Sequence, residues 1–251
     1  MTFFRMDLSY DGTNFEGWQT QLTGRTVQGV IEKALGILLK TPVSIMGAGR
    51  TDAGVHARHQ VAHFSAETRM EGKHFTVGLN SLLPKDVRIL EVSQVDADFH
   101  ARFSAKVRVY HYYFFPGAVA LPWEEPYCWR LGRPMDLQVL NTMAGIILGE
   151  QDFTTFSCAQ DKAKSRKRFI HQSIFYQEGP FLVYRIAGNA FLWRMVRSLV
   201  GSMIKWAPLE GGPEIFRRAL EAKCRDLSGP SAPAKGLFLQ KVVYHDGEWG
   251  Y

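Results

Sequence analysis

Strand-like and helix-like patterns follow one another in a similar irregular succession on both sides of residue 105. Before it, residues 2–10 alternate loosely and end at a turn signal, and residues 26–40 carry apolar side chains at helical spacing. After it, the aromatic and β-branched stretch 107–115 predicts a strand, and helical spacing returns over 136–149. Strands separated irregularly by helices are typical of α+β folds rather than of doubly wound parallel sheets.

We therefore expect two α+β halves, residues 1–105 and 106–251, with no low-complexity linker between them. Thr26 and Asp136 stand where helix N-caps are expected. The remaining predicted elements are helices over 191–206 and from Pro213, and strands over 59–67, 169–177, 181–187 and 236–245.

Composition excludes several classes of protein. An apolar content of 46% with 22% charged residues is typical of a folded globular chain rather than of a disordered one. No apolar run approaches the roughly 20 residues needed to span a bilayer, and charges at Arg5 and Asp7 argue against a signal peptide. The cysteines, Cys128, Cys158 and Cys224, have neither paired nor metal-type spacing, so we expect a cytoplasmic protein without membrane association.

A formal net charge of +6 favours a polyanionic partner, because each neutralised phosphate releases counterions. The basic residues gather in three places: residues 162–168, the segment around Arg102 to Arg108, and the pair Arg194 and Arg197.

The stretch GAGRTDAGVHA, residues 47–57, places a carboxylate on a glycine-rich loop. Asp52 stands where a dinucleotide-binding fingerprint needs its third glycine, so pyrophosphate binding is disfavoured. An ionised Asp52, kept charged by Arg50, can act as a nucleophile, a general base or a stabiliser of positive charge. The plainer alternative, still open at this point, is an Asx-turn at Asp52 and a surface ion pair for Arg50.

Other candidates are weaker. His56, His59 and His63 lie close in sequence, but no Cys or carboxylate completes a ligand set, so we expect no metal site. Tyr110 lies in a strand beside Arg108 and suits stacking on an unpaired base, although an ordinary cross-strand aromatic face is the alternative.

Arg197 lies on an apolar predicted helix, where its charge must either reach solvent or pair with an anion.

Taken together, the chain resembles the bacterial tRNA pseudouridine synthase A family. The resemblance runs in order through almost the whole chain, and its most specific block is GRTDAGVHA. The blocks that carry it are YDGTNFEGWQTQ, TVQGVIEKAL, GRTDAGVHA, GLNSLLPKDVRI, FHARFSAKVRVYHY, FLWRMVRSLVG and APAKGLFLQKVVY.

The resemblance implies isomerisation of uridine to pseudouridine at tRNA positions 38, 39 and 40, in the anticodon arm. It implies that Asp52 is the nucleophile, that Arg50 holds or displaces the target nucleotide, that Tyr110 lies against the uracil, and that Arg197 pairs with Asp52. The implied fold is two α+β halves resembling ferredoxin-like RNA-recognition domains. Their antiparallel sheets would join into one platform, with the active site in the cleft between them. The implied enzyme is a homodimer without a cofactor.

The resemblance also implies tRNA contacts in two segments. They comprise Phe99, His100, Ala101, Arg102 and Phe103 in one, and Lys162, Lys164, Arg166, Lys167 and Arg168 in the other. The stretch FSCAQDKAKSRKRFI, residues 156–170, is more basic and less family-like than expected, which weakens the expectation of contacts from Gln160 to Lys164.

Two alternatives have other chemistry. A non-catalytic RNA-binding module explains the charge and the aromatic residues but not Asp52, because an anion weakens RNA binding. A retaining glycosidase or nucleosidase also uses a carboxylate nucleophile but needs a partner acid about 5 Å away, and neither Glu124 nor Glu125 lies in a suggestive motif. The sequence does not separate attack at C1′, attack at C6 and abstraction of a ribose proton.

Overall fold

The computed structural model describes residues 1–245, and they form two compact units. The first unit comprises Met1–Lys106 together with the chain from Phe238 on, and the second comprises Val107–Leu237. The sequence analysis had grouped the last strand with the second half. Strand β10 (Leu237–Val243) instead pairs with β3 (His56–Ala66) of the first unit, through Phe238 opposite His56.

The sheet of the first unit has the strand order β4-β1-β3-β10. Strand β1 (Thr2–Tyr10) runs antiparallel to both β3 and β4 (Val87–Val95), and the short β2 (Met46–Gly47) is antiparallel to β3. The sheet is antiparallel as expected except at β10, which is parallel to β3 over Phe238 and Leu239. The reason is that β10 is reached through the whole second unit, whereas only a tight hairpin would force an antiparallel neighbour.

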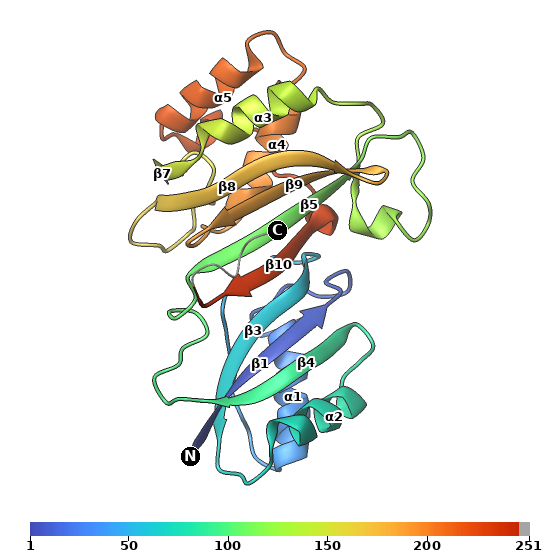
Figure 1. Cartoon of the computed structure of the whole chain (residues 1–251), viewed down its shortest axis with the longest axis vertical. Coiled ribbons are helices and arrows are strands. Elements are labelled where there is room, and N and C mark those ends of the chain that lie inside the picture. Colours follow the sequence, from blue (N-terminus) through green and yellow to red (C-terminus); the bar gives the residue numbers. More distant parts are fainter. Residues whose placement is uncertain (246–251) are drawn as a thin grey trace. The chain divides into compact units, whose positions relative to one another are not determined.

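Two helices pack on one face of this sheet. Helix α1 (Val27–Leu39) begins where predicted, with the Thr26 hydroxyl accepting a hydrogen bond from the Gly29 N–H at 3.3 Å. Helix α2 (Gly72–Leu82) lies beside α1 (Figure 1). Its Phe75 ring lies 4.9 Å from the ring of Phe4 and 5.4 Å from that of Phe64. The sequence analysis missed α2 and β4, because glycines at both Gly72 and Gly78 weaken the helical pattern.

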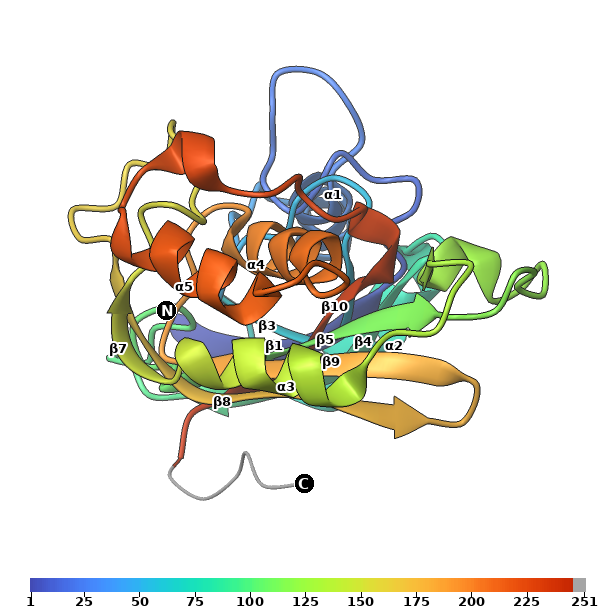
Figure 2. The same cartoon turned by 90° about the horizontal axis from the view of Figure 1, so that it is seen from above.

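The sheet of the second unit has the order β5-β9-β8-β7, and each of these pairs is antiparallel. Its strands are β5 (Val107–Phe115), β7 (Gly149–Asp152), β8 (Lys167–Glu178) and β9 (Phe181–Gly188), with the short β6 (Trp129–Arg130) parallel to β5. Its helices are α3 (Leu137–Ile146), α4 (Met195–Trp206) and α5 (Gly212–Glu221), and Figure 2 shows α4 and α5 on one side of the strands. Asp136 caps α3 as predicted, accepting from Gln138 and Val139 N–H groups.

Helix α4 begins four residues later than its apolar pattern predicted. Arg194, just before it, has a left-handed backbone with φ +60°, which ends the preceding loop. The predicted inward residues are buried as expected: Leu192, Val196, Leu199, Val200 and Met203. Arg197 therefore lies in the first turn of α4 rather than in its middle.

Each unit protects one strand edge with an asparagine side chain. In the first unit, Asn80 of α2 donates to the Ile89 carbonyl at 2.8 Å and accepts from the Ile89 N–H at 2.9 Å. In the second, Asn141 of α3 makes the same two bonds with Phe175 of β8, at 3.0 and 2.8 Å. A side-chain amide thus takes the place of a neighbouring strand in both units.

Among the helices of residues 1–245, none is both long enough and apolar enough to cross a membrane.

Candidate active site

Asp52 stands at the start of a tight turn between β2 and β3. The turn is closed by the Val55 N–H, which donates to the Asp52 carbonyl at 3.1 Å, and Gly54 supplies the left-handed conformation with φ +75°. The preceding Thr51 is buried, whereas the side chain of Asp52 is half-buried. The main chain therefore makes the turn and leaves the side chain of Asp52 partly accessible.

Three hydrogen bonds from residues 10–18 hold this turn in place. The Tyr10 hydroxyl lies 2.8 Å from the Thr51 hydroxyl, in a buried hydrogen bond. The Trp18 N–H donates to the Thr51 carbonyl at 3.1 Å, and the Gly54 N–H donates to the Phe15 carbonyl at 3.2 Å. The position of Asp52 is thus fixed by hydrogen bonds on both sides of it in the chain.

Glycines permit this close approach, and two of them lie outside the loop that the sequence analysis singled out. Gly17 has φ +98°, and a Cβ atom there would lie 2.7 Å from the Thr51 carbonyl oxygen. A Cβ atom on Gly12 would overlap the Val55 carbonyl, and one on Gly47 would lie 2.7 Å from the Trp18 ring. By contrast, Gly49 faces open space. The sequence signal for this close approach was the paired glycines of YDGTNFEGW, to which no role had been assigned.

Arg50 and the three nearby histidines have separate environments. Arg50 is exposed. His56 accepts a hydrogen bond from the Gly12 N–H at 3.0 Å, and His59 lies 2.7 Å from the Asp7 carboxylate. His63 accepts from the Ala101 N–H at 3.1 Å. Each of these histidines is therefore hydrogen-bonded to a different segment of the first unit.

The carboxylate of Asp7 is held by charged neighbours on the sheet. Arg5 donates to it twice, at 2.9 and 2.8 Å. Burial opposes its charged form, but hydrogen bonds from His59 and Arg5 outweigh burial and lower the pKa of Asp7.

In the second unit, the candidate Tyr110 and its neighbour Tyr112, both in β5, differ in their environments. Tyr112 is fully buried and donates its hydroxyl to the Pro233 carbonyl at 2.8 Å, and burial raises its pKa far above the ordinary value. Tyr110 is 8% exposed and meets the Phe191 ring edge-to-face, with centroids 5.2 Å apart. Its neighbour Arg108 donates to the Asn189 carbonyl at 2.7 Å.

Arg197 is bound to a segment that crosses α4. Its Nε donates to the Ala232 carbonyl at 2.8 Å, and its own carbonyl accepts from the Ala232 N–H at 2.9 Å. We call residues 228–236 the strap. Because Tyr112 and Arg197 bond to adjacent carbonyls of the strap, the strap fixes the start of α4 against β5 within this unit.

Small residues on α4 let the strap lie against the helix. A Cβ atom on Gly201 would overlap the Pro230 carbonyl oxygen. The fully buried Ser202 accepts from the Gly229 N–H at 2.9 Å, and Ser198 lies 3.4 Å from the Ser231 hydroxyl. The sequence analysis missed this function of the small residues in RSLVGS.

The segment 99–103 forms a loop held together by imidazole rings. The His100 Nδ1 atom accepts from the N–H groups of Arg102 and Phe103, at 3.1 and 3.2 Å. Ala101 is buried, and its carbonyl accepts from the Tyr244 hydroxyl at 2.7 Å. Arg102 is exposed and Phe103 is 76% exposed, so the loop presents a cation and an aromatic ring. Phe99 packs against Tyr244, with centroids 5.2 Å apart.

The basic segment 162–168 divides into exposed and inward-pointing side chains. Lys162 and Lys164 are exposed. Arg166 is half-buried and donates to the carbonyls of Cys158 and Asp161 and to the Ser157 hydroxyl. Lys167 is also exposed and lies 3.5 Å from Glu150, whereas Arg168 is half-buried and donates to nearby carbonyls. The three lysines are therefore the side chains most accessible to a polyanion in this segment.

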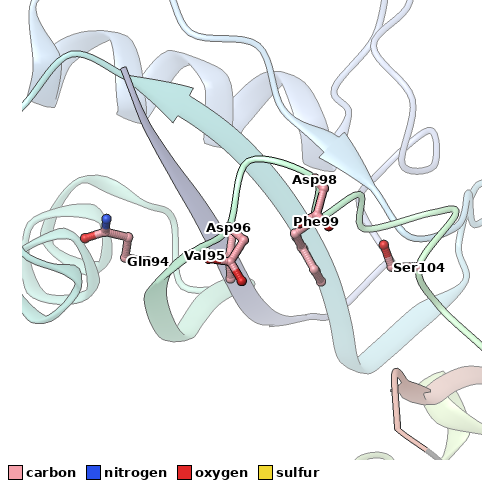
Figure 3. Close-up of a pocket in the computed structure, with 6 residues that line it drawn as sticks. All are labelled: Gln94, Val95, Asp96, Asp98, Phe99 and Ser104. Atoms are coloured by element: carbon pink, nitrogen blue, oxygen red, sulfur yellow. The ribbon is translucent and has the colours of Figure 1, made fainter.

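A hollow in the first unit lies apart from Asp52, beside the 99–103 loop (Figure 3). Its lining includes the carboxylates of Asp96 and Asp98 together with Phe99 and Ser104. Two carboxylates repel phosphate, so this hollow is unsuited to the RNA backbone.

Sequence comparison decides the family. A family model described as tRNA pseudouridine synthase matches residues 8–104 and 143–245. The chain belongs to this family. It is accordingly an isomerase that acts on tRNA.

Curated relatives agree over nearly the whole length. A protein named tRNA pseudouridine synthase A from Treponema denticola is 42% identical over 245 residues, covering 95% of this chain and 91% of the relative. One of the same name from Borrelia duttonii is 41% identical over 238 residues, covering 95% of this chain and 97% of the relative. A solved structure of a Cbf5-Nop10-Gar1 complex matches with a TM-score of 0.38 and 11% identity, covering 94% of this chain and 57% of that one.

Proposed function

We propose that this enzyme converts uridine to pseudouridine at positions 38, 39 and 40 of the tRNA anticodon arm, with Asp52 as its nucleophile. The observation that carries the proposal is the turn of residues 51–55. Buried hydrogen bonds to Thr51 and main-chain bonds on either side hold Asp52 in place, while its side chain remains half-buried rather than enclosed.

The chemistry requires a carboxylate at this place. Isomerisation breaks the N1–C1′ bond, turns the uracil and rejoins it through C5, with loss of the C5 proton. Cleavage of a glycosidic bond develops positive charge on the sugar, which a preorganised carboxylate stabilises or traps. The uracil can depart as an anion with its charge on the carbonyl groups, so no second carboxylic acid is needed. This argument applies to attack at C1′; attack at C6 and abstraction of a ribose proton would use the same carboxylate as a nucleophile toward the base or as a general base.

Tyr110 and Arg197 are proposed to serve the same uridine. To reach Asp52, the base must leave its stack, which costs a few kcal/mol. A tyrosine whose ring is already supported edge-to-face by Phe191 offers a surface for the extruded uracil. Arg197, held by the strap through Nε, is proposed to keep Asp52 ionised. The exposed Arg50 is proposed to enter the space that the base vacates.

Two surfaces are proposed to bind the rest of the anticodon arm. The loop 99–103 presents Arg102 beside the exposed ring of Phe103, a combination that suits phosphate binding and base stacking. In the basic segment, Lys162 and Lys164 are exposed and suit sequence-independent contact with phosphates. Arg166, Lys167 and Arg168 are proposed to add positive potential to the second surface.

The family resemblance supports a homodimer as the working form. Sedimentation of the purified protein with and without tRNA tests it. The cysteines Cys128, Cys158 and Cys224 are free, which suits the reducing cytoplasm that we propose as its location.

The positions are tested by mapping pseudouridine in total tRNA from cells with and without this gene. We expect pseudouridine to disappear at positions 38, 39 and 40 and to persist elsewhere. Unchanged modification at all three positions would reject the proposed substrate site. Free uracil among the products of the purified enzyme would instead indicate a nucleosidase.

A further inference from the structure

We propose that Tyr10, acting through the hydroxyl of Thr51, is a positioning residue for Asp52. The inference rests on the proposed function, because it assigns Tyr10 the task of orienting the proposed nucleophile. The juxtaposition that carries it is a buried pair of hydroxyl groups directly before Asp52 in the chain.

Tyr10 is well placed to act as a fixed reference point. It is the last residue of β1 and lies opposite Ala57 of β3 and Val87 of β4, so strands flank it on both sides. Its side chain is 4% exposed, and its ring lies 6.1 Å from that of the buried Trp18. The hydroxyl that meets Thr51 therefore projects from a buried ring on a strand that is paired on both sides.

Thr51 transmits this position to Asp52. Its hydroxyl lies 2.8 Å from the Tyr10 hydroxyl, and its carbonyl accepts from the Trp18 N–H at 3.1 Å. On the other side of Asp52, its own carbonyl accepts from the Val55 N–H at 3.1 Å. The peptide groups before and after the Asp52 Cα atom are both held, so the direction of its Cα–Cβ bond is set by these bonds.

The hydroxyl pair is the part of this arrangement that a substitution can remove without changing shape. Replacing Tyr10 by Phe keeps the ring and its contact with Trp18 but leaves the buried Thr51 hydroxyl without that partner. The turn then gains freedom to shift. A displacement of about 1 Å at a reacting group costs up to about 100-fold in rate, whereas tRNA binding depends on many other contacts.

Four variants test the proposal by tritium release from tRNA labelled with [5-³H]uridine. For Tyr10→Phe and Thr51→Val we expect kcat to fall about tenfold or more, with KM within about twofold of the parent. Thr51→Ser keeps the hydroxyl and should restore kcat to within about twofold. The double variant Tyr10→Phe/Thr51→Val should be no slower than the slower single variant, because both remove the same bond.

The second unit offers a matched control. Tyr184 and Ser173 form another buried tyrosine–hydroxyl pair, also at 2.8 Å, and neither residue belongs to the proposed machinery. Tyr184→Phe should lose comparable thermal stability to Tyr10→Phe while keeping the parent kcat. All assays run well below the melting temperature of the least stable variant, so that the folded fraction is the same in each.

The outcomes separate the two proposals. A kcat for Tyr10→Phe within twofold of the parent overturns the positioning role, as does an equal kcat loss in Tyr184→Phe. If Tyr10→Phe does not fold, the comparison of Thr51→Val with Thr51→Ser decides, and equal kcat values in that pair overturn the role. Turnover by Asp52→Asn at the parent rate instead overturns the proposed function itself.

Discussion

The two units hold their candidate site residues in different ways. In the first unit, hydrogen bonds fix the main chain around Asp52, and the side chain is presented by the turn. In the second unit, the side chain of Arg197 is itself bonded, through Nε, to the main chain of the strap. An arginine has five donor hydrogens, so one of them can serve to hold the side chain in place.

Despite this difference, both units rely on glycine to bring two main-chain segments into contact. Gly12 and Gly17 admit the turn of Asp52, and Gly201 admits the strap. Both units also close a strand edge with an asparagine, Asn80 in one and Asn141 in the other. The two units therefore share the glycine contacts and the asparagine bonds that build the fold. They differ in whether the main chain or the side chain of the candidate residue is held.

The largest effect should come from filling the space between α4 and the strap. Gly201→Ala forces the strap away from the helix, and we expect a loss of about 3 kcal/mol in the free energy of unfolding. Urea denaturation measures it. The control is Gly145→Ala at the end of α3, where an added Cβ meets open space and stability should be unchanged or higher. Equal effects at both positions would refute the close-contact account of the strap.

If the two units share this device, the hydrogen bonds of Asn80 and those of Asn141 should contribute equally to the free energy of unfolding. Asn80→Ala and Asn141→Ala each leave one strand N–H and one carbonyl without the amide. We expect each to lower the free energy of unfolding by about 2 kcal/mol. Hydrogen exchange at the Ile89 and Phe175 amides should accelerate in the corresponding variant alone. Acceleration of both amides in either variant would show that the effect of each asparagine is not confined to its own unit.

The direct support of Arg197 predicts a modest catalytic effect from a change that keeps its charge. Arg197→Lys lacks the Nε donor, so the strap carbonyl of Ala232 loses its partner. We expect kcat to fall about tenfold with tRNA affinity within about twofold, measured by tritium release and filter binding. A parent-like kcat would show that positive charge alone suffices at this position.

The smallest effect concerns pH. We expect it at the 99–103 loop of the first unit, where His63 accepts a hydrogen bond from the Ala101 N–H. Burial and the neighbouring His100 lower the pKa of His63 from its ordinary value of 6.5. Between 6.5 and that lower value the unfolded chain binds more protons than the folded one, so the stabilisation is present above 6.5 and is lost as pH falls. Protonation also removes the acceptor for the Ala101 N–H.

Hydrogen exchange of the Ala101 amide, corrected for its intrinsic pH dependence, checks this prediction. Protection should decrease as the pH falls below about 6.5, because the folded state resists protonation of His63. His63→Asn places a permanent acceptor near the Nδ1 position and should flatten the dependence. A parent whose protection is independent of pH would contradict the prediction.

Much of the fold followed from local patterns. The strand 107–115, the helix capped by Thr26 and the helix capped by Asp136 were predicted because periodicity and capping are local signals. Helix α2 was missed because its glycines and polar residues hide the apolar face that Phe75 and Leu79 form. The parallel pairing of β10 with β3 depends on contacts between distant segments, which no local pattern contains.

The candidate site divides in the same way. Asp52, Tyr110 and Arg197 were selected from residue type and resemblance, whereas their supports were not. Thr51, Gly17 and Ala232 are small and chemically plain, and their function arises only where the folded chain brings two segments together. A single sequence does not show which of its many glycines make such a contact.

The most direct test of the central claim is the single-turnover rate of tritium release by Asp52→Asn, with the enzyme in saturating excess over [5-³H]uridine-labelled tRNA. Asp136→Asn, which keeps an N-capping residue at α3, is the control and should release tritium at the parent rate. The account predicts that Asp52→Asn binds tRNA as tightly as the parent and releases no tritium. Release by Asp52→Asn at the rate of the control would contradict it.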